Sequence, residues 1–255
     1  MAILIKILVC FIAGMGAGLG TGLAGLSAAA VISPMLITFL DFPAYAAIGI
    51  ALASDVLASA VSAYTYGKKG NIDIKNGAVM LGSVLLFTLV GSFVSSLLPD
   101  STMGGFSKFM TLLVGIKFIV RPVMSTGEKH ASLSASKQVR QSIICGALIG
   151  FICGFVGAGG GMMLLLVLTS VLGYELKTAV GTSVFIMTFT ALTGSLSHFV
   201  IDGAMPDLFV LFLCIVFTLI WARVGASWAN RADVKRMNRV TGIVLCAIGA
   251  LMLFF

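Results

Sequence analysis

Two glycine-rich runs are the parts of this sequence whose composition best suits binding a charged solute. Residues 14–25 and residues 150–161 each contain six glycines. Glycine costs a helix about 1 kcal/mol relative to alanine, so both runs predict an opened backbone followed by a new helix with free N–H groups. Such groups bind anions without any charged side chain. The predicted anion-binding residues in and after the two runs are Gly22, Gly25, Ser27, Gly157, Gly159, Gly160 and Gly161.

The glycine runs also have a second interpretation. Small residues at four-residue spacing let helix backbones approach each other closely in lipid. Glycine at every second position in 14–22 goes beyond that spacing and favours the binding interpretation. Ser27, which follows the first run, is expected to cap the next helix.

Asp55 and His198 are the candidates for carrying a coupling proton. Asp55 lies about halfway along an apolar segment, and an intramembrane carboxylate is a functional-site hypothesis by default. The alternatives are a carboxylate hydrogen-bonded to Ser54 or Ser59, or one at a protomer interface. His198, near the outer end of its segment, titrates near neutral pH in its ordinary state; a hydrogen-bonded interfacial histidine is the alternative.

Three further polar residues are candidate ligands of an anion. Thr182 and Ser183 follow Gly181 and can donate hydrogen bonds, although helical hydroxyls commonly bond their own backbone. Arg223 can clamp an oxyanion in a bidentate manner. Its long side chain can equally reach the lipid headgroups.

Composition places all these residues in a membrane protein. Hydrophobic residues make up 59% of the 255, charged residues 10%, and the mean hydropathy is +1.14. A soluble domain carries about 25% charged residues, so a soluble fold is excluded. The apolar runs are continuous and do not alternate, which predicts helices and not an outer-membrane barrel.

The sequence lacks the residues that several classes of protein need for their function. The five cysteines are scattered through apolar runs without a C-x-x-C pair, and the two histidines lie 68 positions apart, so we expect no metal, no cofactor and no enzyme. No G-x-x-x-x-G-K-[ST] motif is present, which excludes ATP hydrolysis by this chain. The net charge of +7 comes from basic residues confined to loops, so nucleic acid is not an expected partner.

The chain divides into two similar halves. Apolar runs predict ten helical segments, near residues 2–19, 22–40, 44–66, 76–98, 103–120, 139–156, 158–173, 178–201, 205–228 and 237–255. This gives a first transmembrane repeat at 1–120, a connecting loop at 121–138 and a second repeat at 139–255. A shift of 132 residues superimposes four glycines of the first run on glycines and Gly49 on Gly181. The four pairs are Gly14 with Gly146, Gly18 with Gly150, Gly22 with Gly154 and Gly25 with Gly157.

Loop charges predict that the two repeats are inverted. Lys68, Lys69 and Lys75 follow the third segment of the first half, whereas the matching loop carries Asp202 and Asp207 and no lysine or arginine. By the positive-inside rule these loops lie on opposite sides of the membrane, with both termini outside. The first two segments of each half have about 15–18 residues against the roughly 20 needed to span, so they either cross or form a re-entrant hairpin.

These features resemble the TauE/SafE sulfite-exporter family. The resemblance rests on the two glycine runs, Ser33-Pro34, the Ala-x-Gly motifs at Ala47 and Ala179 and the basic central loop, and it covers nearly the whole chain. It implies a permease of the bacterial inner membrane for small anions such as sulfur oxyanions, sulfonates or organic acids. The second half departs from the first: Leu166 stands where the first half has Pro34, and Gly159-Gly160-Gly161 stands where it has Ser27-Ala28-Ala29.

The leading functional prediction is a secondary transporter that moves a small anion by alternating access, with proton coupling. An anion channel would bind its ion through the same interactions and stays open as an alternative. A membrane-embedded enzyme is a weaker alternative. A homodimer is compatible with the sequence, which does not fix the oligomeric state.

Overall fold

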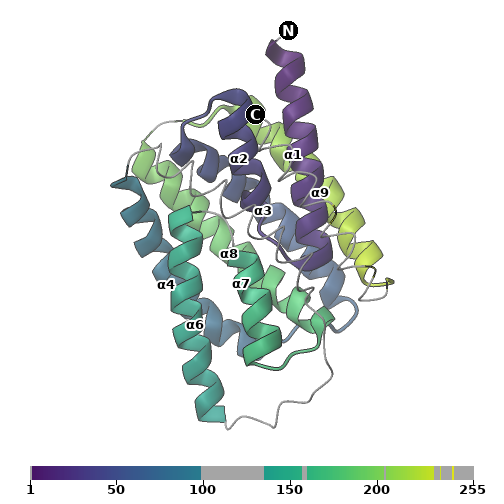
Figure 1. The fold of residues 1–255 in the computed structure, drawn as a ribbon. Helices are drawn as coiled ribbons and strands as arrows, with labels where there is room; N and C mark the ends of the chain where they lie inside the picture. Colours follow the sequence, from purple (N-terminus) through teal and green to yellow (C-terminus); the bar gives the residue numbers. More distant parts are fainter. Residues whose placement is uncertain are drawn as a thin grey trace.

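The described part of the protein is built entirely from helices. The computed structural model describes residues 2–98, 135–156, 160–203 and 205–232, together with Arg236 and Ile243. Within these ranges the elements are α1 (Ala2–Ala24), α2 (Ala29–Leu40), α3 (Ala44–Gly67), α4 (Ile74–Ser96), α6 (Ala135–Val156), α7 (Gly160–Leu166), the π-helix η1 (Val167–Val171), α8 (Leu176–Asp202) and α9 (Leu208–Ala229) (Figure 1). The segments expected near 103–120 and 237–255 lie outside the described residues, apart from Ile243.

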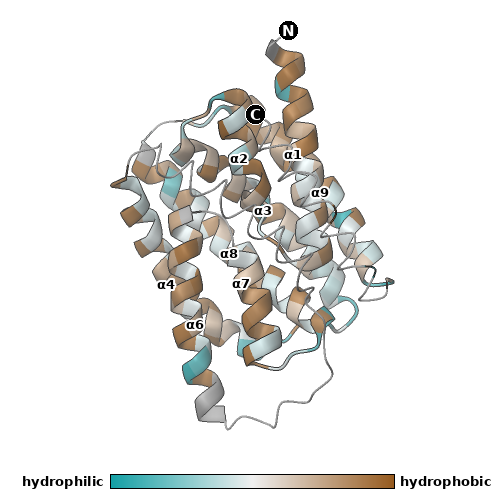
Figure 2. Cartoon of the chain, in the orientation of Figure 1, coloured by the Kyte–Doolittle hydropathy of each residue, from teal (hydrophilic) through white to brown (hydrophobic). Residues whose placement is uncertain are grey.

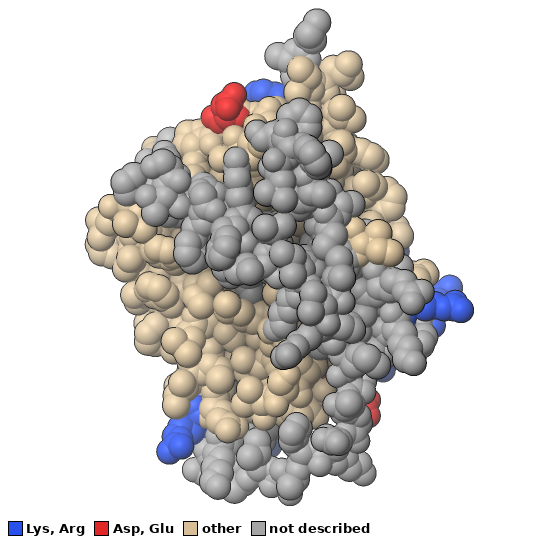
Figure 3. Space-filling view, viewed as in Figure 1, with Lys and Arg blue, Asp and Glu red and all other residues tan. Residues whose placement is uncertain are grey.

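Five of these helices are long and apolar enough to cross a membrane. They are α1, α3, α4, α8 and α9. Large apolar side chains on their outer faces are exposed, as lipid-facing residues are, and the apolar colouring continues along most of each helix (Figure 2). On the face shown in Figure 3 the described charged side chains lie at the margins. The expected helical, multi-pass membrane architecture is confirmed.

The short helices begin later than the sequence predicts. The first glycine run was expected to open the backbone, but α1 continues through it to Ala24, and α2 begins only at Ala29. The predicted opening is therefore wrong for residues 14–24 and falls at residues 25–28. At 1.5 Å per residue, the 12 residues of α2 span about 18 Å, less than the roughly 30 Å of hydrocarbon. In contrast, the 23 residues of α1 are long enough to cross.

Glycines of the first run pack α1 against α9. A Cβ on Gly14 would lie 2.6 Å from Phe217 Cβ, and one on Gly18 would lie 2.8 Å from Ala222 N. A Cβ on Gly22 would lie 2.6 Å from Ala226 N. The contacts advance together along both helices, so α1 and α9 are parallel. For these glycines the packing interpretation is correct, because no side chain fits between the two backbones.

Glycines of α6 pack it against α4 in the same way. Gly146, Gly150 and Gly154 lie in turn against Met80, Val84 and Thr88, again with no room for a Cβ, so α6 and α4 are also parallel. The two pairs thus use the same arrangement: in each, the first helix of one half of the sequence packs along the fourth helix of the other half.

Helices α3 and α8 cross the centre of the bundle in opposite directions. Gly49 near the start of α3 contacts Phe199 near the end of α8, whereas Tyr66 at the end of α3 contacts Gly181 near the start of α8. Helix α9 packs on α3, and α4 packs on α8. The buried core is therefore centred on α3 and α8, and the two short helices pack against this pair.

Polar contacts join the helix ends on both sides of the bundle. At one end, Lys6 Nζ of α1 lies 2.7 Å from Asp207 Oδ2 at the start of α9. At the other end, Asn71 donates to the Asn230 side chain (3.2 Å) and Lys177 donates to the Asn230 carbonyl (3.0 Å). The middle of the bundle between these ends is mainly apolar, with a small number of buried polar residues.

Candidate functional site

The turn between α1 and α2 creates a buried helix start in the middle of the bundle. Gly25 has a φ of +63°, a conformation that favours glycine, and its N–H donates to the Thr21 carbonyl (2.9 Å). The Leu26 N–H donates to the Gly20 carbonyl (3.2 Å), which closes the end of α1. The chain then turns over three residues and begins α2 at Ala29.

The carboxylate of Asp55 lies at this helix start. Asp55 is fully buried in α3, and its Oδ2 accepts a hydrogen bond from Ser27 Oγ (2.9 Å). Its Oδ1 accepts one from Ser59 Oγ (2.9 Å), and the Ala28 N–H also hydrogen-bonds to the carboxylate. Thr21 lies beside it, with its hydroxyl donating to the Ala17 carbonyl (3.0 Å). In the described part of the chain all these partners are uncharged. The anion site predicted at the start of α2 is thus filled by a carboxylate of the protein itself.

Ser27 caps α2 as expected and also binds Asp55. The helix is assigned from Ala29, and the preceding Ala28 makes no side-chain cap. Ser27 Oγ accepts the Ala29 N–H (3.3 Å) while it donates to Asp55, so the predicted capping role is confirmed. Of the two serines proposed as partners of Asp55, Ser59 donates to it, and Ser54 donates instead to the Ile50 carbonyl (2.8 Å).

The start of α7 meets the same turn from the other half of the chain. Gly161, in the first turn of α7, is so close to the turn that a Cβ there would lie 2.7 Å from Ser27 N and would collide with the Gly25 carbonyl. Gly25 in turn lies directly against Ser183 Oγ. The structure therefore brings together four predicted site residues: Gly25, Ser27, Gly161 and Ser183. Gly160 lies beside them, whereas Gly157 and Gly159 are outside the described residues.

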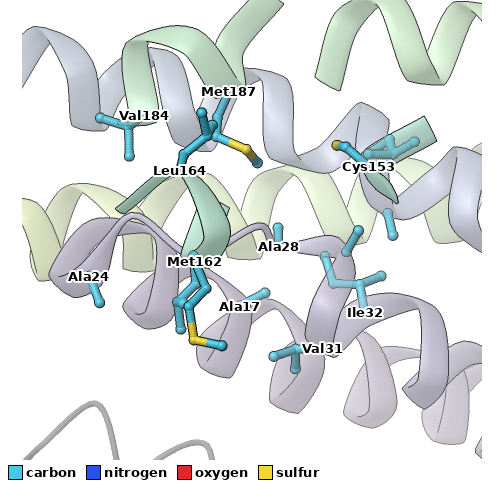
Figure 4. Close-up of a cluster of buried hydrophobic side chains, with 14 of the residues drawn as sticks. Ala17, Ala24, Ala28, Val31, Ile32, Cys153, Met162, Leu164, Val184 and Met187 are labelled. Carbon is cyan, nitrogen blue, oxygen red and sulfur yellow. The ribbon is translucent and has the colours of Figure 1, made fainter. Parts of the chain in front are cut away.

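The surroundings of the two helix starts differ in chemistry. A Cβ on Gly160 would lie 3.0 Å from Cys153 Sγ and 3.7 Å from Met187 Sδ. The shift of 132 residues relates Cys153 to Thr21 and Met187 to Asp55. Figure 4 shows Cys153 and Met187 in a cluster of buried apolar side chains, with Met187 beside Leu164. The second helix start is thus lined by sulfur and carbon where the first is lined by oxygen.

The remaining predicted residues lie elsewhere. Gly22 is used in the contact between α1 and α9, and its carbonyl accepts a hydrogen bond from the Tyr66 hydroxyl (3.1 Å). Thr182 accepts the Asp73 N–H (3.0 Å) near the start of α4. Arg223 is exposed at the far end of α9, on a different face from the one that packs on α1. None of these three residues is among the groups that hydrogen-bond to Asp55 in the described part of the chain.

His198 is buried and hydrogen-bonded. It is 1% exposed, its Nε2 lies 3.1 Å from the Gly154 carbonyl oxygen, and its ring lies 4.2 Å from the ring of Tyr45. It lies four residues before the end of α8, which agrees with the alternative of a hydrogen-bonded histidine near the end of its segment. In the described part of the chain His198 is not among the groups that hydrogen-bond to Asp55.

Sequence reasoning missed Thr21 as a neighbour of the carboxylate and the backbone of Ala28 as its partner. A signal for Thr21 was present, because it has the only polar side chain in residues 14–25. Ala28 carried no such signal: its contribution comes from an N–H group whose position depends on where α2 begins.

A multi-pass helical bundle that closes over a buried carboxylate at a helix start has the features of a membrane transporter. Comparison with known proteins gives the family. The profile of the sulfite exporter TauE/SafE family matches residues 10–252, and the chain belongs to this family. The resemblance found in the sequence is confirmed, and the chain is a membrane transporter by family.

Curated relatives match over nearly their full length. The chain is 24% identical to "Probable membrane transporter protein YdhB" of Bacillus subtilis (strain 168), over 93% of this chain and 96% of that protein. It is 26% identical to YunE of the same organism, which carries the same description, over 93% and 91%. It is 29% identical to a "Probable membrane transporter protein" of Haemophilus influenzae, over 95% and 96%. No solved structure gives a significant match.

Proposed function

We propose that this protein is a secondary transporter that moves a small anion across the cell inner membrane by alternating access, with a proton carried on Asp55. The family name supports a sulfur oxyanion such as sulfite as the substrate class, and sulfonates and small organic acids share its charge and size. The observation that carries the proposal is the Asp55 carboxylate held by Ser27 and Ser59 at the amino end of α2.

The coupling of anion transport to a proton follows from the charge of Asp55 at the start of α2. Ionised Asp55 occupies the hydroxyl and N–H donors and satisfies the positive end of the α2 dipole. A proton on Asp55 removes that negative charge, so the same donors become available to a solute anion. Anion and proton then bind together and are released together, and their combined gradients set the direction of net transport.

Two halves of opposite orientation supply the alternating access. The opposite directions of α3 and α8, which correspond under the 132-residue shift, support this arrangement. The parallel pairing of α1 with α9 and of α6 with α4 supports it as well. The start of α7 touches the Gly25–Ser27 turn in the described conformation, so binding requires the two to move apart. This movement is the proposed opening step.

The orientation of the protein in the membrane can be tested separately. We expect the end with Lys68, Lys69 and Lys177 to be cytoplasmic, with both termini outside. A cysteine replacing Lys69 should then react with an impermeant maleimide only after the cell membrane is opened. A cysteine replacing Asp202 should react in intact cells. Reaction of both from the same side would contradict the inverted orientation.

Uptake into liposomes tests the transport mechanism. Purified protein should take up radiolabelled sulfite, driven by an acidic exterior, at a rate that saturates with sulfite concentration. It should also exchange internal for external sulfite without a gradient. A flux that rises linearly with concentration and shows no exchange would instead indicate a channel, the alternative that shares the same site chemistry.

A further inference from the structure

A basic pocket lies at the ends of α3 and α9, away from Asp55. Its volume is about 370 Å³, enough for a phosphate group with part of its substituent. The lining residues come from the last turns of both helices and the segments after them: Val61, Tyr64, Thr65, Lys68, Lys69, Arg223, Ser227, Asn230 and Arg231.

The pocket carries an excess of positive charge. Four of its nine lining residues are cations and none is acidic. In the described part of the chain the one ion pair joins Lys6 to Asp207, at the other end of the bundle. The carboxyl ends of α3 and α9 both point here, and two helix ends supply about one unit of negative charge in total. Four cations therefore leave a surplus of about three positive charges, more than is needed to satisfy the helix ends.

The surface next to the pocket is apolar and exposed. Leu57 of α3 and Ile220 of α9 lie about one turn before the first lining residue of their helices and are 45% and 52% exposed. Val224, which follows Arg223 in α9, is 49% exposed. Tyr64 is also exposed and receives Lys68 Nζ over its ring at 4.5 Å. An aromatic ring and basic side chains above lipid-facing apolar residues are the arrangement found at the headgroup level of a membrane.

We propose that this pocket binds the phosphate group of an anionic phospholipid, with the acyl chains on the adjacent apolar surface of α3 and α9. Arg223 and Arg231 offer planar donors suited to phosphate oxygens, and Lys68 and Lys69 add charge. A free inorganic phosphate has the same headgroup chemistry but gains nothing from the apolar surface. The lipid is therefore the better ligand, and the proposal does not depend on the substrate of the transporter.

The test measures binding to the full-length protein in neutral detergent. The probes are phosphatidylglycerol, phosphatidylcholine with the same acyl chains, and inorganic phosphate. The variants are Arg223→Gln and the double variant Lys69→Gln/Arg223→Gln. Lys75→Gln removes the same charge from an exposed position outside the pocket and serves as the matched control. Arg223→Lys keeps the charge, and thermal unfolding of each variant shows whether it is folded.

Phosphatidylglycerol should bind and phosphatidylcholine should bind at least tenfold more weakly. Each cation removed from the pocket should weaken phosphatidylglycerol binding about fivefold, because one surface cation contributes ~1 kcal/mol to anionic lipid binding. Lys75→Gln should change it much less, and Arg223→Lys should retain most of it. Equal binding by the double variant and the control would overturn the proposal. So would inorganic phosphate binding as tightly as the lipid.

Discussion

The starts of α2 and α7 occupy matching places in the two halves of the chain, yet only the first carries a carboxylate. At the first, Asp55 is held by two serines and an N–H group, beside Thr21. At the second, Met187 and Cys153 stand at the corresponding positions. A carboxylate loses its charge when it binds a proton, whereas a thioether does not titrate and a thiol is ordinarily neutral at pH 7. The comparison therefore places the proposed proton switch in the first half and gives the second helix start a packing role.

Removing the carboxylate is expected to have the largest effect. Asp55→Asn keeps the shape and one acceptor oxygen for the serines, replaces the other oxygen by an NH2 donor, and fixes the site in a neutral form. Uptake driven by an acidic exterior should fall about 10- to 100-fold, since a hydrogen bond to a charged group contributes about 1.5–3 kcal/mol. Anion exchange should persist.

Asp41→Asn is the matched control for that variant. Asp41 is exposed at the end of α2 in a left-handed conformation, which asparagine also adopts. It should leave both activities intact. If Asp55→Asn kept the pH dependence of uptake in the liposome assay, Asp55 would lose its coupling role.

The contact between the two helix starts gives the next largest effect. Gly161→Ala places a Cβ against the backbone of Gly25 and Ser27, which cannot yield as a side chain would. We expect a loss of about 1–3 kcal/mol in stability and reduced uptake. Gly82→Ala, which meets no atom within 4 Å, should not destabilise the protein. Equal thermal unfolding temperatures for the two variants would show that the helix starts are not in contact.

The second helix start should tolerate substitution. Met187→Leu conserves volume and is expected to cost less than about 1.5 kcal/mol. Because Met187 cannot titrate, the pH profile of uptake should keep its shape and midpoint. A shifted midpoint would indicate that the sulfur side of the site takes part in proton coupling and that the two starts are more alike than their residues suggest.

The smallest effect concerns two aspartates that begin α9 and α4. Hydrogen bonding to Lys6 lowers the pKa of Asp207 below its ordinary value. Burial raises the pKa of Asp73, but hydrogen bonds from Asn76 and Tyr174 outweigh it and lower the pKa overall. A lowered carboxyl pKa stabilises the protein above the ordinary value of about 3.9, and this stability is lost as the pH falls through the lowered pKa.

Asp207→Asn separates the ion pair from the cap, since asparagine also caps helices. The substitution should cost at most about 1 kcal/mol near neutral pH, because the pair is partly exposed. The difference from the unmodified protein in thermal unfolding should disappear on acidification below about pH 4. A difference that persists in acid would mean that the contact does not depend on charge.

The sequence predicted the membrane class and singled out Asp55 as a candidate, because hydropathy and an isolated carboxylate are local signals; the division into two repeats stays a prediction. It failed at the glycine runs. Close backbone contact with α9 stabilises Gly14, Gly18 and Gly22 in a helix, and this gain from another part of the chain outweighs their intrinsic cost. The break falls at Gly25, where a positive φ is required.

The occupant of the predicted anion site could not be read from spacing either. Asp55 is 28 residues from Ser27, and their contact depends on how α3 packs beside α2. The position of the Arg223 side chain could not be predicted from the sequence either. Helical periodicity could not decide whether it faces the bundle or the headgroups, because α9 is apolar nearly all round.

The pairing of α1 with α9 has a consequence for how the chain is made. Lys6 and Asp207 are 201 residues apart, so α1 leaves the ribosome long before its partner exists. At about 5–20 residues per second the delay is roughly 10–40 seconds. During translation α1 therefore has to reside in lipid, or against the insertion machinery, with its glycine face uncovered. Assembly of the bundle must await nearly the last part of the polypeptide.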